Sequence, residues 1–466
     1  MIRTKKVNLV DRTAMLHRVL QSLRASAFSQ ASQILIQFVS VPILIHAWGL
    51  VYYGEWLLLF TIPSYLGLSD AGLTSAISNE LLIQVSKKEY PKAARLLGNG
   101  MTSIIGFGVL ASAFLAAALE FSDFTIWLKI NRIQVLEARF IVLILMIYVM
   151  LILQQELMST VPRAEGDNAT GRIWTTITRL LEFALVVILV TVGYKALAVA
   201  LGYLVVRGLS WGAMFFYYRH RYSWVSQVKV GWFPLAEIRH LLSPSLAFLG
   251  FALANSMILQ GSTLLIGFFM TPVHVVIYTA LRTLSNFIRQ MMNLLTSAIW
   301  PELTRALIAN DLPRAVILHR RVCQIAFWTS LGLLFILETT GGPILSVWTK
   351  GTVQPVQPVF TLLLLATLPY SLWLTSATIA ISVNRHQTIA LNFVLSSLCT
   401  LVAATWLIPR YGLSGLAIGL LIGDCFMLFP VFRDSLRILL EERIEKLVPA
   451  IVTDFGWLNK LQKQQR

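Results

Sequence analysis

The sequence predicts an all-α polytopic membrane protein whose twelve transmembrane helices form two six-helix bundles related by a parallel pseudo-two-fold repeat. Three observations support this fold class. The 466-residue chain is 56% hydrophobic and only 13% charged, with a mean hydropathy of +0.71. Its apolar residues are gathered in runs of about 20 residues, the length of helix that crosses a bilayer. The two halves also share short motifs at a nearly constant offset.

The apolar runs are predicted to be helices, because they are too long for barrel strands and every backbone polar group in a span must be paired internally. The first run follows a basic N-terminal segment. It is longer than the core of a signal peptide and lacks a small-residue cleavage site, so it is predicted to be an uncleaved span. The predicted spans are 25–46, 54–78, 99–120, 139–162, 170–192, 196–218, 242–269, 275–300, 322–345, 358–383, 387–408 and 413–432.

The basic residues predict the orientation. With twelve spans and a cytoplasmic N-terminus, 27 of the 38 Lys and Arg residues fall in cytoplasmic segments, 5 on the opposite side and 6 inside spans. This asymmetry follows the positive-inside rule and places both termini in the cytoplasm. The predicted divisions are a basic N-terminus 1–24, an N-lobe 25–218, a central basic cytoplasmic connection 219–241, a C-lobe 242–432 and an amphipathic cytoplasmic tail 433–466.

Composition argues against several other classes. The net charge of +16 could suggest a nucleic-acid partner, but the basic residues lie between apolar runs and not on one domain, so topology explains them. Cys323, Cys399 and Cys425 are an odd, scattered set within or beside apolar runs. Their odd number and scattered placement argue against disulfide bonds and against a metal site, and they are predicted to be small buried apolar residues.

An internal repeat relates the two halves. Glu80-Leu81 and Pro91-Lys92-Ala93 in the first half correspond, at one constant offset, to Glu302-Leu303 and Pro313-Arg314-Ala315 in the second. Six spans per half is an even number, so the halves have the same orientation in the membrane. Parallel repeats of this kind are typical of transporters that bind substrate between two lobes. Further matches, at a slightly smaller offset, are Tyr194, Ala200, Gly202 and Leu204 with Tyr411, Ala417, Gly419 and Leu421.

Span 275–300 carries an unusual set of polar residues. Arg282, Asn286, Arg289 and Asn293 lie within about 60° of one another on a helix, so they share one face. An arginine at the middle of a span costs roughly 2.5–3.5 kcal/mol to insert. The stripe is therefore predicted to line a polar cavity. Guanidinium groups match phosphate oxygens, so the cavity is predicted to accept an anionic substrate.

Other spans contribute ionisable groups. Arg24 stands at the mouth of the first span, and Arg179 with Glu182 lies in the fifth, where an ion pair within one helix is the alternative to a functional role. Arg207 and Asp424 lie nearer span ends and are predicted to snorkel or cap there, as is Glu338.

Short motifs near the N-terminus resemble those of a known family. The chain is similar to the oligosaccharide flippases of the multidrug/oligosaccharidyl-lipid/polysaccharide (MOP) superfamily, which translocate repeat units for O-antigen, capsule or exopolysaccharide synthesis. The residues that carry the resemblance are Val41-Pro42, Gly49, Tyr53-Gly54-Glu55-Trp56, Asp70-Ala71-Gly72-Leu73, Asn79-Glu80-Leu81 and Tyr278–Arg282.

The resemblance implies a V-shaped pair of lobes in a bacterial inner membrane. The implied activity moves an undecaprenyl-diphosphate-linked oligosaccharide from the cytoplasmic to the periplasmic leaflet by alternating access. Arg282 and Arg289, helped by Arg24 and Arg179, are expected to bind the diphosphate. Membrane lipids are expected partners, together with the polysaccharide polymerase and chain-length machinery. No cofactor, nucleic-acid partner or enzymatic activity is expected.

The driving force and the competing functions stay open at this point. Moving a unit charge across 100 mV is worth about 2.3 kcal/mol, so a membrane potential could drive export of a diphosphate without a coupled ion. If an ion is coupled, Asp70, Glu156 and Glu182 are the candidate carboxylates. The alternatives are a cation-coupled multidrug antiporter of the same superfamily and a non-transporting membrane enzyme of glycan assembly.

Overall fold

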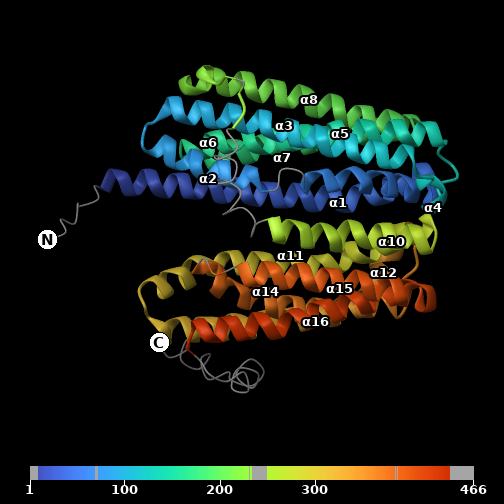
Figure 1. The fold of residues 1–466 in the computed structure, drawn as a ribbon. Helices are drawn as coiled ribbons and strands as arrows, with labels where there is room; N and C mark the ends of the chain where they lie inside the picture. The colour runs from blue at the N-terminus through green and yellow to red at the C-terminus, as the bar shows by residue number, and fades with distance from the viewer. Residues whose placement is uncertain are drawn as a thin grey trace. The chain divides into compact units, whose positions relative to one another are not determined.

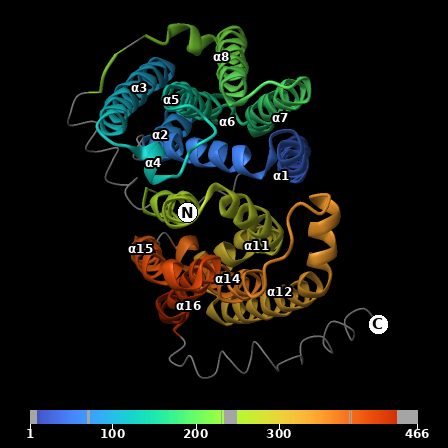
Figure 2. The same cartoon turned by 90° about the vertical axis from the view of Figure 1, so that its right-hand side faces the viewer.

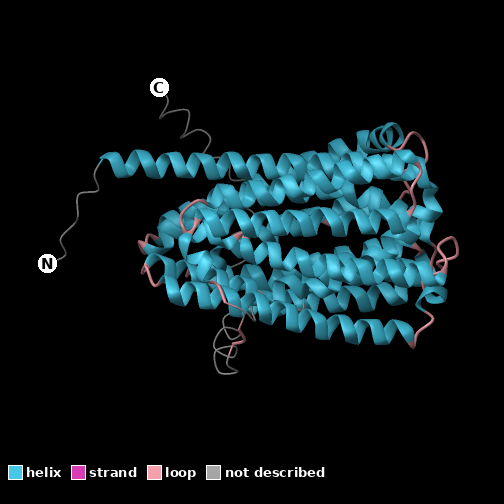
Figure 3. Cartoon of the chain, turned by 90° about the horizontal axis from the view of Figure 1, so that it is seen from above, coloured by secondary structure: helices cyan, strands magenta, loops and turns pink. Residues whose placement is uncertain are grey.

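The computed structural model describes residues 9–68, 72–229, 231–233, 249–383, 385 and 387–440. Every regular element in these residues is helical (Figure 3). Ten helical segments among them are long and apolar enough to cross a membrane. The predicted fold class, an all-α protein built of long apolar helices, is confirmed. The chain divides into two compact units, Met1–Leu249 and Gly250–Arg466.

The first unit contains eight α-helices and two 3-10 turns in its described residues. Five of the helices are long, and they run side by side in Figure 1. The elements are α1 (Leu9–Ser64), η1 (Tyr65–Leu68), α2 (Leu73–Ser86), α3 (Tyr90–Glu120), α4 (Phe124–Trp127), α5 (Val135–Met158), α6 (Thr160–Ala164), α7 (Asn168–Val192), α8 (Ala196–Arg221) and η2 (Ser223–Gln227).

Helix α1 holds the first predicted span and the first part of the second. Gly49 has φ 72° and ψ 168°, a conformation that breaks the helix and that glycine adopts without steric cost. The second span, predicted over 54–78, ends as α1 at Ser64 and resumes as α2, which continues to Ser86. Gly72, with φ 77°, precedes α2 in the left-handed region. The predicted uninterrupted span was therefore wrong in its middle and at its end.

Hydrogen bonds fix the two ends of the first bundle. At one end, Trp48 Nε1 donates to the carbonyl of Tyr194, and the backbone N–H of Ala196 donates to the Tyr52 hydroxyl, each over 3.1 Å. At the other end, Asn168 Nδ2 donates to Ser22 Oγ over 3.0 Å. The break in α1 and the α7–α8 turn thus lie at the same end, as antiparallel neighbouring spans require.

Helix α5 is the most central helix of the first unit. It packs against α1, α3 and α8, and Figure 2 shows it beside α3 and α8. Its apolar side chains are buried on more than one side, as Ile141 and Met146 on different faces of the helix show. A helix surrounded in this way can carry side chains that face an internal site.

The second unit has the same kind of construction. Its first described helix runs from residue 249 and contains a π-helical turn. Helix α14 is its central helix, in contact with α11, α12 and α16. The elements are η3 (Met257–Gly261), α10 (Ser262–Phe269), α11 (Pro272–Ile308), α12 (Leu312–Trp348), α13 (Val359–Leu365), α14 (Thr367–Ser382), α15 (Gln387–Tyr411) and α16 (Leu413–Ile438).

A stripe of glycines lets α16 approach α15 closely. Gly415, Gly419 and Gly423 recur every four residues and therefore share one face of α16. A β-carbon at Gly415 would overlap the backbone of Leu407, and one at Gly423 would overlap the Thr400 hydroxyl. Small residues at such spacing are a usual means of packing helices within a membrane.

The internal repeat extends to the backbone conformation of the turns. Lys88 and Asn310 correspond at the offset of the Glu-Leu motif, and both have positive φ, 60° and 55°. Lys129 and Lys350 correspond at nearly the same offset and have φ of 55° and 52°. Left-handed conformations are uncommon for residues other than glycine, so two such pairs indicate that the halves share their turn structure.

Two predicted segments lie partly outside the described residues. Helix α16 covers the start of the predicted tail 433–466 as far as Ile438, and 441–466 are not described. Of the predicted connection 219–241, α8 includes the first three residues and η2 follows, while 234–241 are not described.

Candidate functional site

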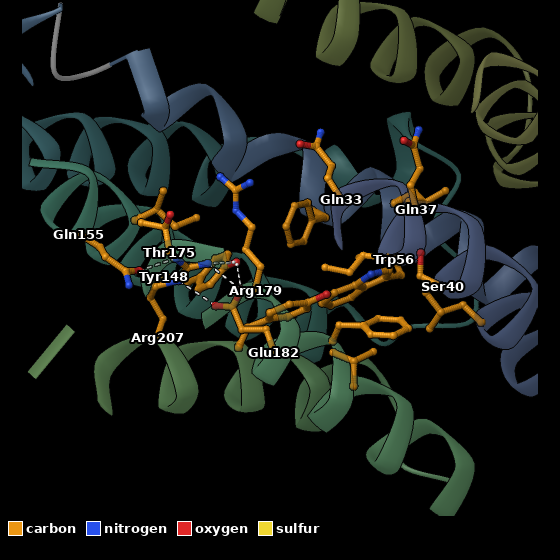
Figure 4. A pocket seen from close by; sticks show the side chains of 18 of the residues that line it. Gln33, Gln37, Ser40, Trp56, Tyr148, Gln155, Thr175, Arg179, Glu182 and Arg207 are labelled. Carbon is orange, nitrogen blue, oxygen red and sulfur yellow. Dashed lines mark hydrogen bonds and ion pairs between the residues drawn. The ribbon is translucent and has the colours of Figure 1, made fainter. Parts of the chain in front are cut away.

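A cavity of about 540 Å³ lies inside the first unit (Figure 4). Its walls come from α1, α5, α7 and α8, all of which belong to membrane-spanning segments. The volume falls within the roughly 300–1,000 Å³ that is usual for small-molecule sites. A cavity that holds polar and charged side chains among apolar spans is a candidate functional site, because polar groups at that depth are costly unless they serve a purpose.

A buried ion pair between Glu182 on α7 and Arg207 on α8 contributes to the cavity wall. Arg207 Nε donates to Glu182 Oε1 over 2.8 Å, and Arg207 Nη2 donates to Oε2 over 2.6 Å. The two side chains are only 4% and 6% exposed. The two parallel bonds match the planar fork of the guanidinium to the carboxylate, the strongest geometry for such a pair.

The remaining donors of Arg207 are also satisfied. Its Nη1 donates to Gln155 Oε1 over 2.5 Å, and its Nη2 also lies 3.3 Å from the Tyr148 hydroxyl. Gln155 Nε2 in turn donates to Thr178 Oγ1 over 2.9 Å. The network joins α5, α7 and α8. With its hydrogen bonds made inside the protein, Arg207 serves as a structural cation and not as a receptor for an anion.

An aromatic floor, formed by Trp56, Phe60, Tyr148 and Tyr203, adjoins this pair. The Trp56 and Tyr203 rings are stacked with an interplanar angle of 7° and centroids 6.4 Å apart. Tyr203 also lies 5.3 Å from Tyr148 and 6.1 Å from Phe60. Trp56 and Tyr148 are buried, whereas Phe60 and Tyr203 are partly exposed. The buried rings thus hold the partly exposed ones in place.

A polar rim completes the cavity and consists of Gln33 and Gln37 on α1 and Arg179 on α7. In Figure 4 the ends of all three side chains point to the same side of the view, above the aromatic rings and the Arg207–Glu182 pair. The two glutamines are four residues apart and so lie on one face of α1, which Ser40 continues. Arg179 is exposed. The rim can therefore offer amide groups and one cation to the same ligand.

The carboxylates of the cavity differ in their surroundings. Glu182 takes Arg207 of the neighbouring helix as its partner, where an ion pair with Arg179 on the same helix was the alternative prediction. Glu156 lines the cavity and is exposed. The predicted span-end position of Arg207 was wrong: its side chain is buried because Glu182 neutralises it.

The second unit contains an ion pair of its own. Arg289 Nη2 lies 2.6 Å from Asp424 Oδ2, and its guanidinium sits 4.1 Å from the centre of the Tyr370 ring. Trp373 Nε1 donates to the other oxygen of Asp424 over 3.1 Å. Asp424 was predicted to cap a span end, and this was wrong, since it is 6% exposed and neutralises an arginine on a helix distant in the sequence.

The other polar residues of α11 are more accessible. Arg282 is partly buried, lies 5.2 Å from the centre of the Tyr278 ring, and has Nη1 3.4 Å from the carbonyl of Leu259. No described carboxylate forms an ion pair with it. Asn286 is partly buried, and Asn293 is exposed, with its amide donating to the carbonyl of Arg289 over 2.9 Å.

The remaining predicted residues lie elsewhere. Arg24 is exposed near the start of α1, and Asp70 lies outside the described residues. Glu55 is fully buried and accepts hydrogen bonds from the backbone N–H groups of Asn131, Arg132 and Ile133 at 2.8–3.0 Å. Its carboxylate therefore anchors the α4–α5 connection.

Sequence reasoning missed the rim glutamines and the aromatic floor. Gln33, Gln37 and Ser40 have the spacing of one helix face in an otherwise apolar run, a signal of the same kind as the stripe on α11. The aromatic floor has no such signal, because its four rings come from three different helices. In the part of the chain that the structure describes, no group of three or more His, Cys, Asp or Glu side chains could hold a metal ion.

One comparison with known proteins identifies a family. Residues 19–307 match a family model described as polysaccharide biosynthesis protein. No curated protein matches the sequence significantly.

Several solved structures share the fold. An inward-facing multidrug resistance MATE family transporter of the MOP superfamily has a TM-score of 0.66 at 14% identity, covering 87% of this chain and 98% of that chain. The lipid II flippase MurJ in an inward closed conformation has a TM-score of 0.65 at 16% identity, covering 91% and 90%. An outward-facing MATE transporter has a TM-score of 0.60 at 14% identity, covering 91% and 96%. At these identities the likeness concerns the fold.

Proposed function

The chain belongs to the family of polysaccharide biosynthesis proteins and has the fold of MOP-superfamily transporters, and from this premise we propose that it is a flippase for a lipid-linked oligosaccharide. Its substrate is an undecaprenyl-diphosphate-linked repeat unit, which moves from the cytoplasmic to the periplasmic leaflet of a bacterial inner membrane. The process makes and breaks no covalent bond.

The observation that carries the proposal is the cavity of the first unit with its polar and charged side chains. A saccharide head group is too polar to cross the hydrocarbon core unaided, and amide, hydroxyl and guanidinium groups in a shielded cavity can replace its hydration shell. The cavity offers these groups beside aromatic faces. The lipid tail has no need of a protein site, because it is as apolar as the bilayer.

Within the cavity, Arg179 binds the diphosphate. It is exposed at the rim, whereas Arg207 is occupied by Glu182 and Gln155. A guanidinium group forms paired, charge-assisted hydrogen bonds with phosphate oxygens. Arg282 in the second unit is a further candidate for anion binding, since no described carboxylate neutralises it.

The membrane potential can supply the driving force. A diphosphate with about two negative charges that moves outward across a membrane with an inside-negative potential of 100 mV gains roughly 4–5 kcal/mol. This free energy is available without coupling to an ion. Glu156 is the cavity carboxylate to test if ion dependence is found, because Glu182 is committed to Arg207.

A second candidate is a multidrug antiporter. The observation in its favour is the aromatic floor together with Glu156, since aromatic faces and a carboxylate attract organic cations. The two candidates predict opposite substrate charges.

Transport by purified protein in proteoliposomes distinguishes them. Loss of lipid-linked oligosaccharide from one leaflet and its appearance at the other, measured with a glycan-cleaving or glycan-binding reagent that cannot cross the bilayer, supports the flippase. Protein-dependent efflux of a cationic dye without transfer of the glycolipid supports the antiporter.

A further inference from the structure

The charges that line the first-unit cavity do not give it a net positive character. Its charged lining residues are Arg179, Arg207, Glu156 and Glu182, two of each sign. Attraction of an anion by net charge is therefore weak here, and Arg207 is already neutralised by Glu182. The neutral part of the cavity must supply most of its selectivity.

That neutral part has a specific chemistry. Gln33 and Gln37 place two amides one helical turn apart, and each amide can both donate and accept hydrogen bonds. Neighbouring hydroxyls on a sugar ring also donate and accept hydrogen bonds, so a pair of amides can bind a pair of sugar hydroxyls. A phosphate group only accepts, and an organic cation only donates or does neither. A hydroxyl-bearing ligand can therefore use both the N–H and the oxygen of each amide, whereas a phosphate can use only the N–H and an organic cation at most the oxygen.

The aromatic residues add a complementary surface. Phe60, Phe183 and Tyr203 line the cavity and are partly exposed. The C–H faces of a pyranose ring are apolar and pack against aromatic faces, while its hydroxyls point outward to polar groups. Trp56 is stacked against Tyr203 and fixes its orientation, so this surface is preorganised.

From these features we infer that the first-unit cavity is a saccharide-binding site that recognises the sugar next to the phosphate of the lipid carrier. Gln33 and Gln37 hydrogen-bond the sugar hydroxyls, the ring packs on Phe183 and Tyr203, and Arg179 on the same rim holds the adjoining phosphate. The inference rests on the proposed function and names which part of the substrate this cavity binds.

The test compares two probes on the purified full chain in lipid nanodiscs. One probe is undecaprenyl diphosphate, and the other is undecaprenyl diphosphate carrying the oligosaccharide repeat unit of the host. Wild-type protein is expected to bind the glycosylated lipid more tightly. Gln33→Met and Gln37→Met preserve length and volume without the amide. Each is expected to weaken binding of the glycosylated lipid about three- to tenfold, the loss of one hydrogen bond, and to leave the bare lipid unaffected.

The control variant is Gln30→Met, on the same helix at an exposed position that does not line the cavity. It should bind both probes as the wild type does. Equal weakening of both probes by the Gln33 and Gln37 variants would assign the amides to the phosphate and overturn the inference. Unchanged binding of the glycosylated lipid, or equal wild-type affinity for the two lipids, would also overturn it.

The leaflet-transfer assay separates this inference from the proposed function. If wild-type protein moves the glycosylated lipid and the glutamine variants bind it normally, only the saccharide site is wrong. If wild-type protein moves no glycosylated lipid, the flippase proposal fails, whatever the binding data show.

Discussion

Arg207 on α8 forms a bidentate ion pair with Glu182 on α7, with both side chains less than a tenth exposed. The pair lies beside Tyr148 on the central helix α5. In the second unit, Arg289 and Asp424 pair beside Tyr370 on the central helix α14, at the position that corresponds to Tyr148 in the repeat. Each unit thus holds an ion pair against an equivalent tyrosine. Arg207 and Asp424 also correspond, at the offset of the Tyr194 and Tyr411 match, whereas their partners Glu182 and Arg289 come from different positions in the repeat.

Replacing Arg207 with methionine should destabilise the protein strongly. Glu182 would keep a buried charge without its partner, which costs about 3–5 kcal/mol. The double variant Arg207→Met with Glu182→Met should recover a large part of this loss, because neither charge then remains. Denaturant unfolding of purified protein in detergent measures the free energy of unfolding of the single and the double variant. A single variant within about 1 kcal/mol of the wild type would mean that the pair is solvated and not buried.

Replacing Arg179 with alanine should leave stability almost unchanged, within about 0.5 kcal/mol, because its side chain is exposed. Transport should fall about ten- to a hundredfold, since a charge-assisted hydrogen bond is worth roughly 1.5–3 kcal/mol. Arg179→Lys should recover part of the activity, because it keeps the charge but not the planar fork. Full transport by Arg179→Ala would remove this residue from the binding site.

The two arginines of α11 should behave differently. Arg289→Ala leaves Asp424 buried without its cation, so thermal unfolding should occur at a markedly lower temperature. Arg282→Ala breaks no ion pair to a described carboxylate, so it should fold normally and lose transport. Measurements of membrane abundance and unfolding temperature distinguish a loss of stability, expected for Arg289→Ala, from a loss of transport in a stable protein, expected for Arg282→Ala. Equal stability of both variants would contradict the structural role assigned to Asp424.

Glu55→Gln should loosen the connection between α4 and α5. The carboxylate accepts four backbone hydrogen bonds, and the amide keeps only one accepting oxygen. The expected loss is about 1.5–3 kcal/mol of local stability. Hydrogen exchange at the amides of residues 131–133 should accelerate, while exchange in α7, as the internal control, should not. Unchanged protection at these three amides would show that the carboxylate does not anchor them.

Much of the fold was predictable from the sequence, because apolar runs of span length have few other solutions in a membrane. The breaks within runs were less predictable. Gly49 and Gly72 interrupt helices through their backbone conformation, which a hydropathy pattern does not record. The repeat was visible in short motifs, and the matching left-handed turns at Lys88 and Asn310 support it.

The candidate site was less predictable. Arg289 was predicted to bind the diphosphate, and this role stays a prediction. The sequence did not reveal its partner Asp424, because Asp424 lies far along the chain and contacts between distant helices leave no local signal. Arg207 pairs with Glu182 on the preceding span, and a hydropathy pattern does not record which faces of two neighbouring helices meet. Gln33 and Gln37 had a readable helical spacing, whereas the aromatic floor depends on the packing of three helices.

The most direct test of the central claim is transfer of lipid-linked oligosaccharide between leaflets of proteoliposomes, with and without an imposed potential. The lumen corresponds to the periplasm, so a lumen-positive potential should draw the diphosphate inward. We expect protein-dependent transfer that this potential accelerates and that Arg179→Ala slows at least tenfold. Transfer at the rate of protein-free liposomes, or at the same rate in wild type and Arg179→Ala, would contradict the account.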